Sequence, residues 1–168
     1  MNLFQVQWMK GNTDRMDKTE IIDALKSQLR EQYRRAVAAV QDAAEAATGE
    51  DAKAESKYDT RGLEASYLAA GQVEQADRLA KELAAVEAFH FPDFTSRSLI
   101  EPGALVEAKL DGNSVYYLLA PGGGGLTIES GQATITVLGN EAPLRGHLLD
   151  QKVGGRVERP PLEITAIW

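Results

Sequence analysis

Proline is absent from the whole segment between Asp17 and His90, and this absence constrains the fold more than any other feature of the sequence. All six prolines and eleven of the fifteen glycines come after that segment. The proline-free part is rich in alanine, glutamate, glutamine and arginine, which favour long helices, whereas the later part has short runs with β-branched residues. We therefore expect a helical part over 17–91 and a sheet part over 92–168, preceded by a mobile extension over 1–16.

The helical part contains two seams of apolar or small residues spaced three and four apart, as in packed antiparallel helices. The first seam comprises Ile22, Leu25, Leu29, Gln32, Ala36, Ala39, Ala43 and Ala46; the second comprises Leu63, Tyr67, Ala70, Val73, Ala76, Leu79 or Ala80, Leu83 and Val86. Two helices of about 28 to 31 residues would each extend roughly 40 to 45 Å, so the hairpin must project from a small domain. Its alanines predict a slim distal half, although helix propensity alone also explains them.

Acidic residues gather where the hairpin reverses, at about 48–62. The segment from Asp42 to Asp59 has six acids against two lysines, and Glu64 follows at the start of the second helix. Carboxylates held together can bind a hard cation such as Mg²⁺. The ordinary alternative is a solvated loop in which Asp59 and Glu64 simply favour a helix N-terminus.

The second part predicts a sheet with one short helix. Alternating runs indicate strands over 105–110, 115–119, 133–138 and 162–167, and Asp111-Gly112-Asn113 is a strong hairpin signal. A short helix is expected over 143–150, with Pro143 in its first turn. The four glycines at 122–125 predict a flexible connection between strands. The fold class is therefore α+β, an antiparallel helical hairpin followed by a small antiparallel sheet domain.

Composition excludes several classes of function. The formal charge of −7, from 18 basic and 25 acidic residues, disfavours independent binding to DNA or to an anionic membrane. Without cysteine there is no disulfide, thiolate nucleophile or thiolate-bound zinc, and the two histidines are His90 and His147. His147 has no nearby constellation of Ser and Asp in the sequence to form a hydrolase triad. No run is long and apolar enough to span a membrane, and no signal peptide is apparent, so a cytoplasmic location is expected.

The run Ala142-Pro143-Leu144-Arg145-Gly146-His147-Leu148-Leu149-Asp150-Gln151-Lys152-Val153-Gly154-Gly155-Arg156-Val157 resembles the C-terminal signature of the Gre family (GreA and GreB) of bacterial transcript-cleavage and elongation factors. The family pattern is Ser-Pro-Leu-Gly, an apolar pair, Gly-Lys, and Gly-Asp before a valine-rich strand. Arg145, Asp150 and Gly155 depart from it. The order of parts also resembles the family, in which an antiparallel coiled coil precedes an FKBP-like domain, and the resemblance covers roughly residues 17–168.

The resemblance implies a factor that docks on bacterial RNA polymerase and inserts its hairpin into the secondary channel. Tip carboxylates would share a Mg²⁺ with the polymerase near the nascent RNA 3′ end, so that the polymerase cleaves backtracked RNA. The factor itself would be no enzyme and would hold no cofactor tightly. Asp59 and Glu64 are the candidate acids, with Glu50, Asp51 and Glu55 as alternates.

The tip departs from the family. Cleavage-competent members carry Asp-Leu-Ser-Glu followed by Asn-Ala-Glu-Tyr, whereas Asp59 and Glu64 are five positions apart with Arg61 and Gly62 between them. A regulator or inhibitor that occupies the channel without stimulating cleavage therefore stays open, as does a structural adaptor whose coiled coil pairs with another protein. The expected docking surface on the polymerase side includes Pro143, Leu144 and Leu148.

Overall fold

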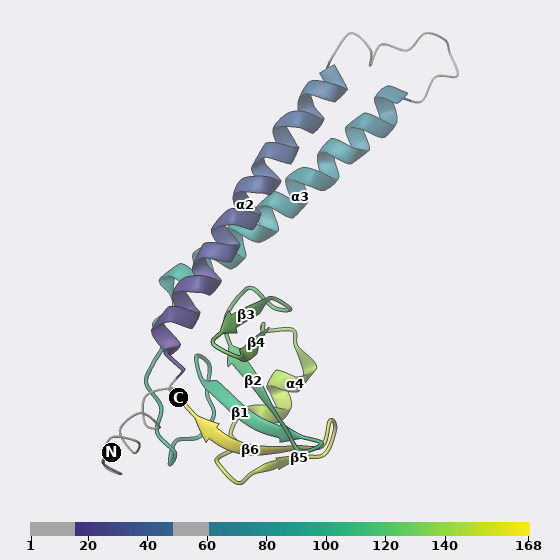
Figure 1. Ribbon diagram of the computed structural model, residues 1–168. Helices are drawn as coiled ribbons and strands as arrows, with labels where there is room; N and C mark the ends of the chain where they lie inside the picture. Colours follow the sequence, from purple (N-terminus) through teal and green to yellow (C-terminus); the bar gives the residue numbers. More distant parts are fainter. Residues whose placement is uncertain (1–15, 49–60) are drawn as a thin grey trace, which may run out of the picture.

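The computed structural model describes residues 16–48 and 61–168 (Figure 1). Two long helices, α2 (Lys18–Thr48) and α3 (Arg61–Ala88), precede a six-stranded sheet that carries the short helix α4 (Pro143–Leu148). The α+β class and the antiparallel hairpin are confirmed, and Arg30 of α2 pairs with Glu87 of α3 at 2.6 Å. Most of the predicted extension and of the predicted tip lies outside the described residues.

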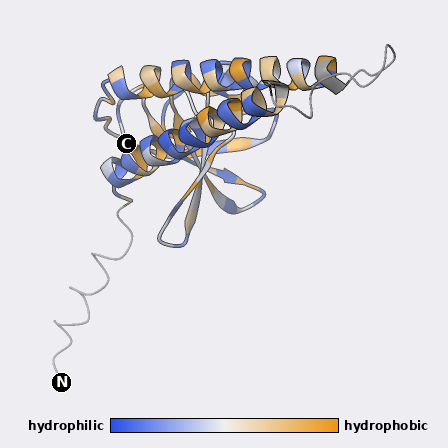
Figure 2. Ribbon diagram, turned by 90° about the horizontal axis from the view of Figure 1, so that it is seen from above, coloured by the Kyte–Doolittle hydropathy of each residue, from blue (hydrophilic) through white to orange (hydrophobic). Residues whose placement is uncertain are grey.

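The buried stripe of α2 begins one residue earlier than predicted. Its buried apolar residues are Ile21, Leu25, Leu29, Ala36 and Ala43, whereas Ile22 is half-buried. The first three of these are spaced four apart, because this part of α2 packs against the sheet as well as against α3. The hydropathy colouring in Figure 2 shows hydrophobic residues recurring along both helices between hydrophilic ones.

The seam of α3 forms only in its C-terminal half. Ala76, Leu79 and Val86 are buried, but the predicted seam residues Leu63 and Tyr67 are 57% and 69% exposed. The distal half of α2 offers mainly alanine side chains, which are too short to cover a leucine or a tyrosine. The hairpin is therefore tightly packed near the sheet and loosely packed toward its far end.

The strands lie in the order β3-β4-β2-β1-β6-β5. Their bounds are β1 (Leu105–Leu110), β2 (Asn113–Leu119), β3 (Thr127–Ser130), β4 (Ala133–Leu138), β5 (Arg156–Val157) and β6 (Leu162–Ile167). The four predicted strands are present, and the predicted turn places Asp111 and Gly112 at positive φ. The edge strands β3 and β5 were not predicted. The chain reverses direction before β3 and again before β4, so β3 and β4 are antiparallel and β4 runs parallel to β2. The sheet is therefore mixed, and the prediction of a wholly antiparallel sheet is wrong.

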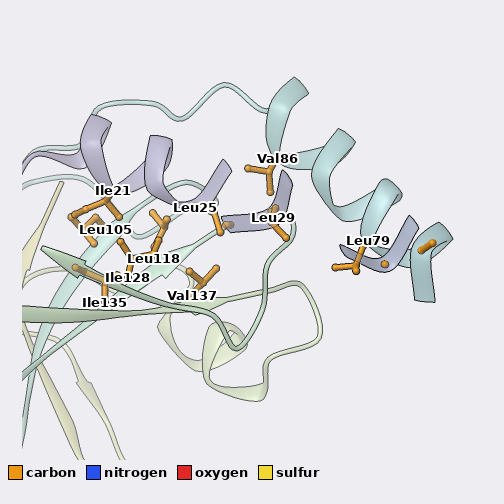
Figure 3. Close-up of a cluster of buried hydrophobic side chains, with 13 residues drawn as sticks. Ile21, Leu25, Leu29, Leu79, Val86, Leu105, Leu118, Ile128, Ile135 and Val137 are labelled. Atoms are coloured by element: carbon orange, nitrogen blue, oxygen red, sulfur yellow. The ribbon is translucent and has the colours of Figure 1, made fainter. Parts of the chain in front are cut away.

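Each face of the sheet has its own core. On one face, Leu105, Leu118 and Ile135 pack with the base of the hairpin, as Figure 3 shows. On the other face, Val106 and Leu119 pack in a cluster with α4, and the register follows the alternation of side chains along each strand. The base of the hairpin is therefore part of the hydrophobic core of the sheet and not a separate unit joined by a linker.

The glycine-rich loop at 122–125 lies between the hairpin and the sheet. Gly122 and Gly123 are buried, and the Gly123 N–H donates a hydrogen bond of 2.8 Å to a carboxylate oxygen of Glu82 on α3. The prediction of a flexible connection is therefore wrong for this loop. Among the helices of the described chain, none combines the length and apolar character that crossing a membrane requires.

Candidate functional site

The distal end of the hairpin carries the one predicted tip acid that the structure places. Glu64 lies in the first turn of α3 and is exposed, where the positive end of the helix dipole favours a carboxylate. Its proposed partner Asp59 lies outside the described residues, as do the alternates Glu50, Asp51 and Glu55. The pairing of Asp59 with Glu64 therefore stays a prediction.

The donor set for Mg²⁺ is partial in the described chain. Over 16–48 and 61–168, no three or more histidine, aspartate or glutamate side chains come together as a metal site. Mg²⁺ accepts one or two protein carboxylates and fills its remaining positions with water or with ligands from another molecule. Of the acids predicted to bind this ion, Glu64 alone lies among the described residues, so binding of Mg²⁺ stays a prediction.

Large apolar side chains are exposed on the part of α3 that carries Glu64. Leu63, Tyr67 and Leu68 are 57%, 69% and 61% exposed, and Val73 is 44% exposed. Sequence reasoning placed Leu63 and Tyr67 in the helix seam, and it did not single out Leu68. The distal hairpin thus presents apolar surface beside a carboxylate.

The predicted docking surface on α4 is smaller than expected. Leu148 is fully buried in the core on the far side of the sheet from the hairpin, so it is not available to a partner, and that part of the prediction is wrong. Pro143 is exposed at the start of α4, and Leu144 is half-buried. Only Pro143 and Leu144 remain as candidates for contact with a partner.

Arg145 explains one departure from the Gre signature. Its side chain is buried, and one guanidinium nitrogen donates to the carbonyl oxygens of Ala120 at 2.7 Å and Leu138 at 3.0 Å. Burial lowers the pKa of this arginine from its usual value. The side chain thus joins the carboxyl ends of the parallel strands β2 and β4, which is a structural role.

A cleft of about 380 Å³ opens next to α4 and is lined by His147, Gln151, Arg156, Val157, Glu158 and Arg159. None of these lining residues is a serine, threonine or lysine. Arg156 is also paired with Glu163 at 3.2 Å, which reduces the positive charge of the cleft. The lining of this cleft therefore offers no hydroxyl nucleophile beside His147.

Lys18 anchors the start of the hairpin to the sheet domain. Its ammonium group donates to the carbonyl oxygens of Pro92 at 2.6 Å and Trp168 at 3.0 Å, and it lies 4.8 Å from the centroid of the Phe94 ring. Burial lowers the pKa of Lys18 to about 8, and the nearby Asp93 carboxylate opposes that shift. The first turn of α2, the segment after α3 and the end of β6 are thus held at one point.

Comparisons with known proteins give only distant structural neighbours. No protein-family model matches the chain, and no curated protein matches it. Similar solved structures include the GreA factor homolog 1 (Gfh1) protein of Thermus thermophilus, at 18% identity and a TM-score of 0.34, over 86% of this chain and 95% of that one. A structure of the transcription factor Gfh1 is similar at 17% identity and a TM-score of 0.35, over 86% of this chain and 93% of that one.

Proposed function

We propose that this protein binds bacterial RNA polymerase through its sheet domain and inserts the distal hairpin into the secondary channel. There, carboxylates near the hairpin end, Glu64 with Asp59, would share a Mg²⁺ with the polymerase and stimulate cleavage of backtracked RNA at its 3′ end. The polymerase would supply the nuclease activity, so this chain is a factor and not an enzyme. The Gre-like signature at 142–157 supports this assignment.

The structural observation that carries the proposal is the projection of the hairpin beyond the sheet (Figure 1). The sheet domain touches α2 at Leu25, Gln28 and Leu29, and α2 then continues to Thr48. At 1.5 Å per residue, the 19 residues from Leu29 to Thr48 extend about 28 Å. Two helices side by side are each about 10 Å across, which suits entry into a narrow channel.

A transcript-cleavage assay on stalled polymerase tests the proposal. The full chain is expected to bind core polymerase and to increase the cleavage rate, and Glu64→Gln is expected to reduce that increase at least tenfold without reducing binding, because a neutral amide is a poor Mg²⁺ ligand. Glu74→Gln is the matched control, since Glu74 is an exposed acid farther along the same helix. Equal stimulation by both variants would contradict the role of Glu64.

The exposed Leu63, Tyr67 and Leu68 favour a second candidate, a regulator that occupies the channel without stimulating cleavage. Apolar side chains contribute binding surface but cannot hold a metal ion. This candidate predicts polymerase binding and slower nucleotide addition, with no cleavage by the unmodified protein. Failure to bind polymerase at all would instead favour a coiled-coil adaptor for another protein.

A further inference from the structure

The backbone of the loop at 122–125 lies directly against both helices of the hairpin. A Cβ atom on Gly122 would come within 2.7 Å of the backbone oxygen of Glu82, and one on Gly123 within 2.7 Å of a methyl carbon of Leu25. Gly123 also has a φ of +76°, a backbone angle that residues other than glycine rarely adopt. We call Gly122 and Gly123, with their contacts Leu25 and Glu82, the glycine joint.

The loop that forms the joint is tied firmly to the sheet. The Ala120 N–H donates to the Leu138 oxygen at 3.1 Å, and the Gly125 N–H donates to the Val137 oxygen at 2.9 Å. The Val137 N–H in turn donates to the Leu126 oxygen at 2.9 Å. Because β4 holds the loop at several points, the loop moves with the sheet.

The hairpin is bound to the sheet domain at three separate levels. Lys18 binds the Pro92 and Trp168 carbonyls at the base, and the side-chain amide of Gln28 donates to the Thr127 oxygen at 3.1 Å. Glu82 on the other helix accepts the Gly123 N–H. Contacts at three points that involve both helices oppose rotation of the hairpin as well as its sliding.

We propose that the glycine joint sets the angle between hairpin and sheet, and that Glu82 is a positioning residue for the distal end. The consequence for transcript cleavage rests on the proposed function, but the angle itself is a property of the free protein. Only glycine at 122 lets α3 approach the loop so closely, and the Glu82 carboxylate holds α3 in that place.

A small change at the joint is amplified at the far end. Moving a contact from 2.7 Å to the ordinary 3.4 Å requires a shift of 3.4 − 2.7 = 0.7 Å at Glu82. The Arg30–Glu87 pair places Glu82, five residues before Glu87, about level with Arg35, which lies 17 residues or about 26 Å from Lys18. Glu82 and Arg61 are 21 residues apart, about 32 Å. With the base held at Lys18, the 0.7 Å shift grows about twofold, to about 1.5 Å at the start of α3.

Distances between paired spin labels in the free protein test the joint, and the absence of native cysteine allows clean labelling. With labels at exposed positions Asp42 and Gln132, Gly122→Ala is expected to shift the mean distance by about 1 Å, because Asp42 lies about 36 Å from Lys18, and Glu82→Ala is expected to broaden the distribution. Gly71→Ala is the control, because a Cβ there meets open space. Distributions for Gly122→Ala and Glu82→Ala that match the unmodified protein would overturn the proposal.

The cleavage assay separates positioning from folding. Glu82→Ala is expected to lower the cleavage rate at saturating factor about tenfold to a hundredfold, because an error of about 1 Å in placing reacting groups has effects of that size. Polymerase affinity should change less than twofold, and Glu82→Gln should restore cleavage because its amide oxygen can accept the same N–H. Unchanged cleavage by Glu82→Ala would refute the positioning role. If the unmodified protein does not stimulate cleavage, the proposed function fails while the label distances still decide the joint.

Discussion

Replacing Arg145 by methionine tests whether this buried cation stabilises the parallel strand pair. The substitution keeps a long, uncharged side chain but removes both hydrogen bonds that Nη1 of Arg145 donates to the carbonyls of Ala120 and Leu138. The Leu138 oxygen still accepts the Ala120 N–H at 3.1 Å, so only the Ala120 oxygen loses its described partner. A buried carbonyl left without a donor costs about 1–3 kcal/mol, and the lost bond to Leu138 adds about 1 kcal/mol.

Relief of the buried charge offsets part of that loss, since burial already lowers the pKa of Arg145. We therefore expect Arg145→Met to lower the free energy of unfolding by about 2 kcal/mol, or Tm by about 4–8 °C for a chain of this size. Urea unfolding followed by Trp168 fluorescence in a Trp8→Phe background measures the change. Arg35→Met is the control, because the Arg35 side chain is 70% exposed. A change no larger than that of Arg35→Met would refute the reasoning.

Three further predictions concern the hairpin base and the docking surface. Burial lowers the pKa of Lys18 from 10.5 to about 8, so the unfolded chain binds this proton more tightly than the folded chain does. Between about pH 8 and pH 10.5 the free energy of unfolding should therefore rise with pH. This rise should be absent in Lys18→Met. An NMR titration that gives Lys18 an ordinary lysine pKa would contradict this expectation. Leu29→Ala should lower the free energy of unfolding, measured with heat or urea, by about 2–5 kcal/mol because Leu29 is 1% exposed. Leu63→Ala, at a side chain that is 57% exposed, should lower it by less than about 0.5 kcal/mol. Equal losses of stability in the two variants would contradict the packing described. Leu144→Asp should weaken polymerase binding in a pull-down at least fivefold without changing the circular dichroism spectrum, and the same substitution at the exposed Leu99 should not; retention of binding by Leu144→Asp would remove α4 from the docking surface.

The order of helices and strands could be predicted because proline, glycine and apolar spacing report it directly. Strand β3 escaped prediction because it is only four residues long and follows four glycines, although Ile128 is buried at its centre. Missing that strand also hid the parallel pairing of β2 with β4. The alternation of residues along the sequence predicts where a strand lies, but it does not predict which strand pairs with it or in which direction.

The candidate site could be predicted less well than the fold. Leu148 was predicted to belong to the docking surface with Pro143 and Leu144, but a helix of six residues gives no periodicity from which to assign its buried face. The seam on α3 was extended to Leu63 because spacing alone does not show whether the facing helix is wide enough to cover it. Both errors concern which neighbour a side chain meets, and that depends on tertiary packing.

The contacts with the sheet lie at the base of the hairpin, so the length of the hairpin does not affect how it is fixed to the sheet. Seven residues could be removed from α2 between Ala36 and Thr48, and seven from α3 between Arg61 and Ala76. The hairpin would become about 10 Å shorter, and its contacts with the sheet would stay the same. The length of the hairpin can thus change, by natural selection or by design, without any change in the residues that hold it to the sheet.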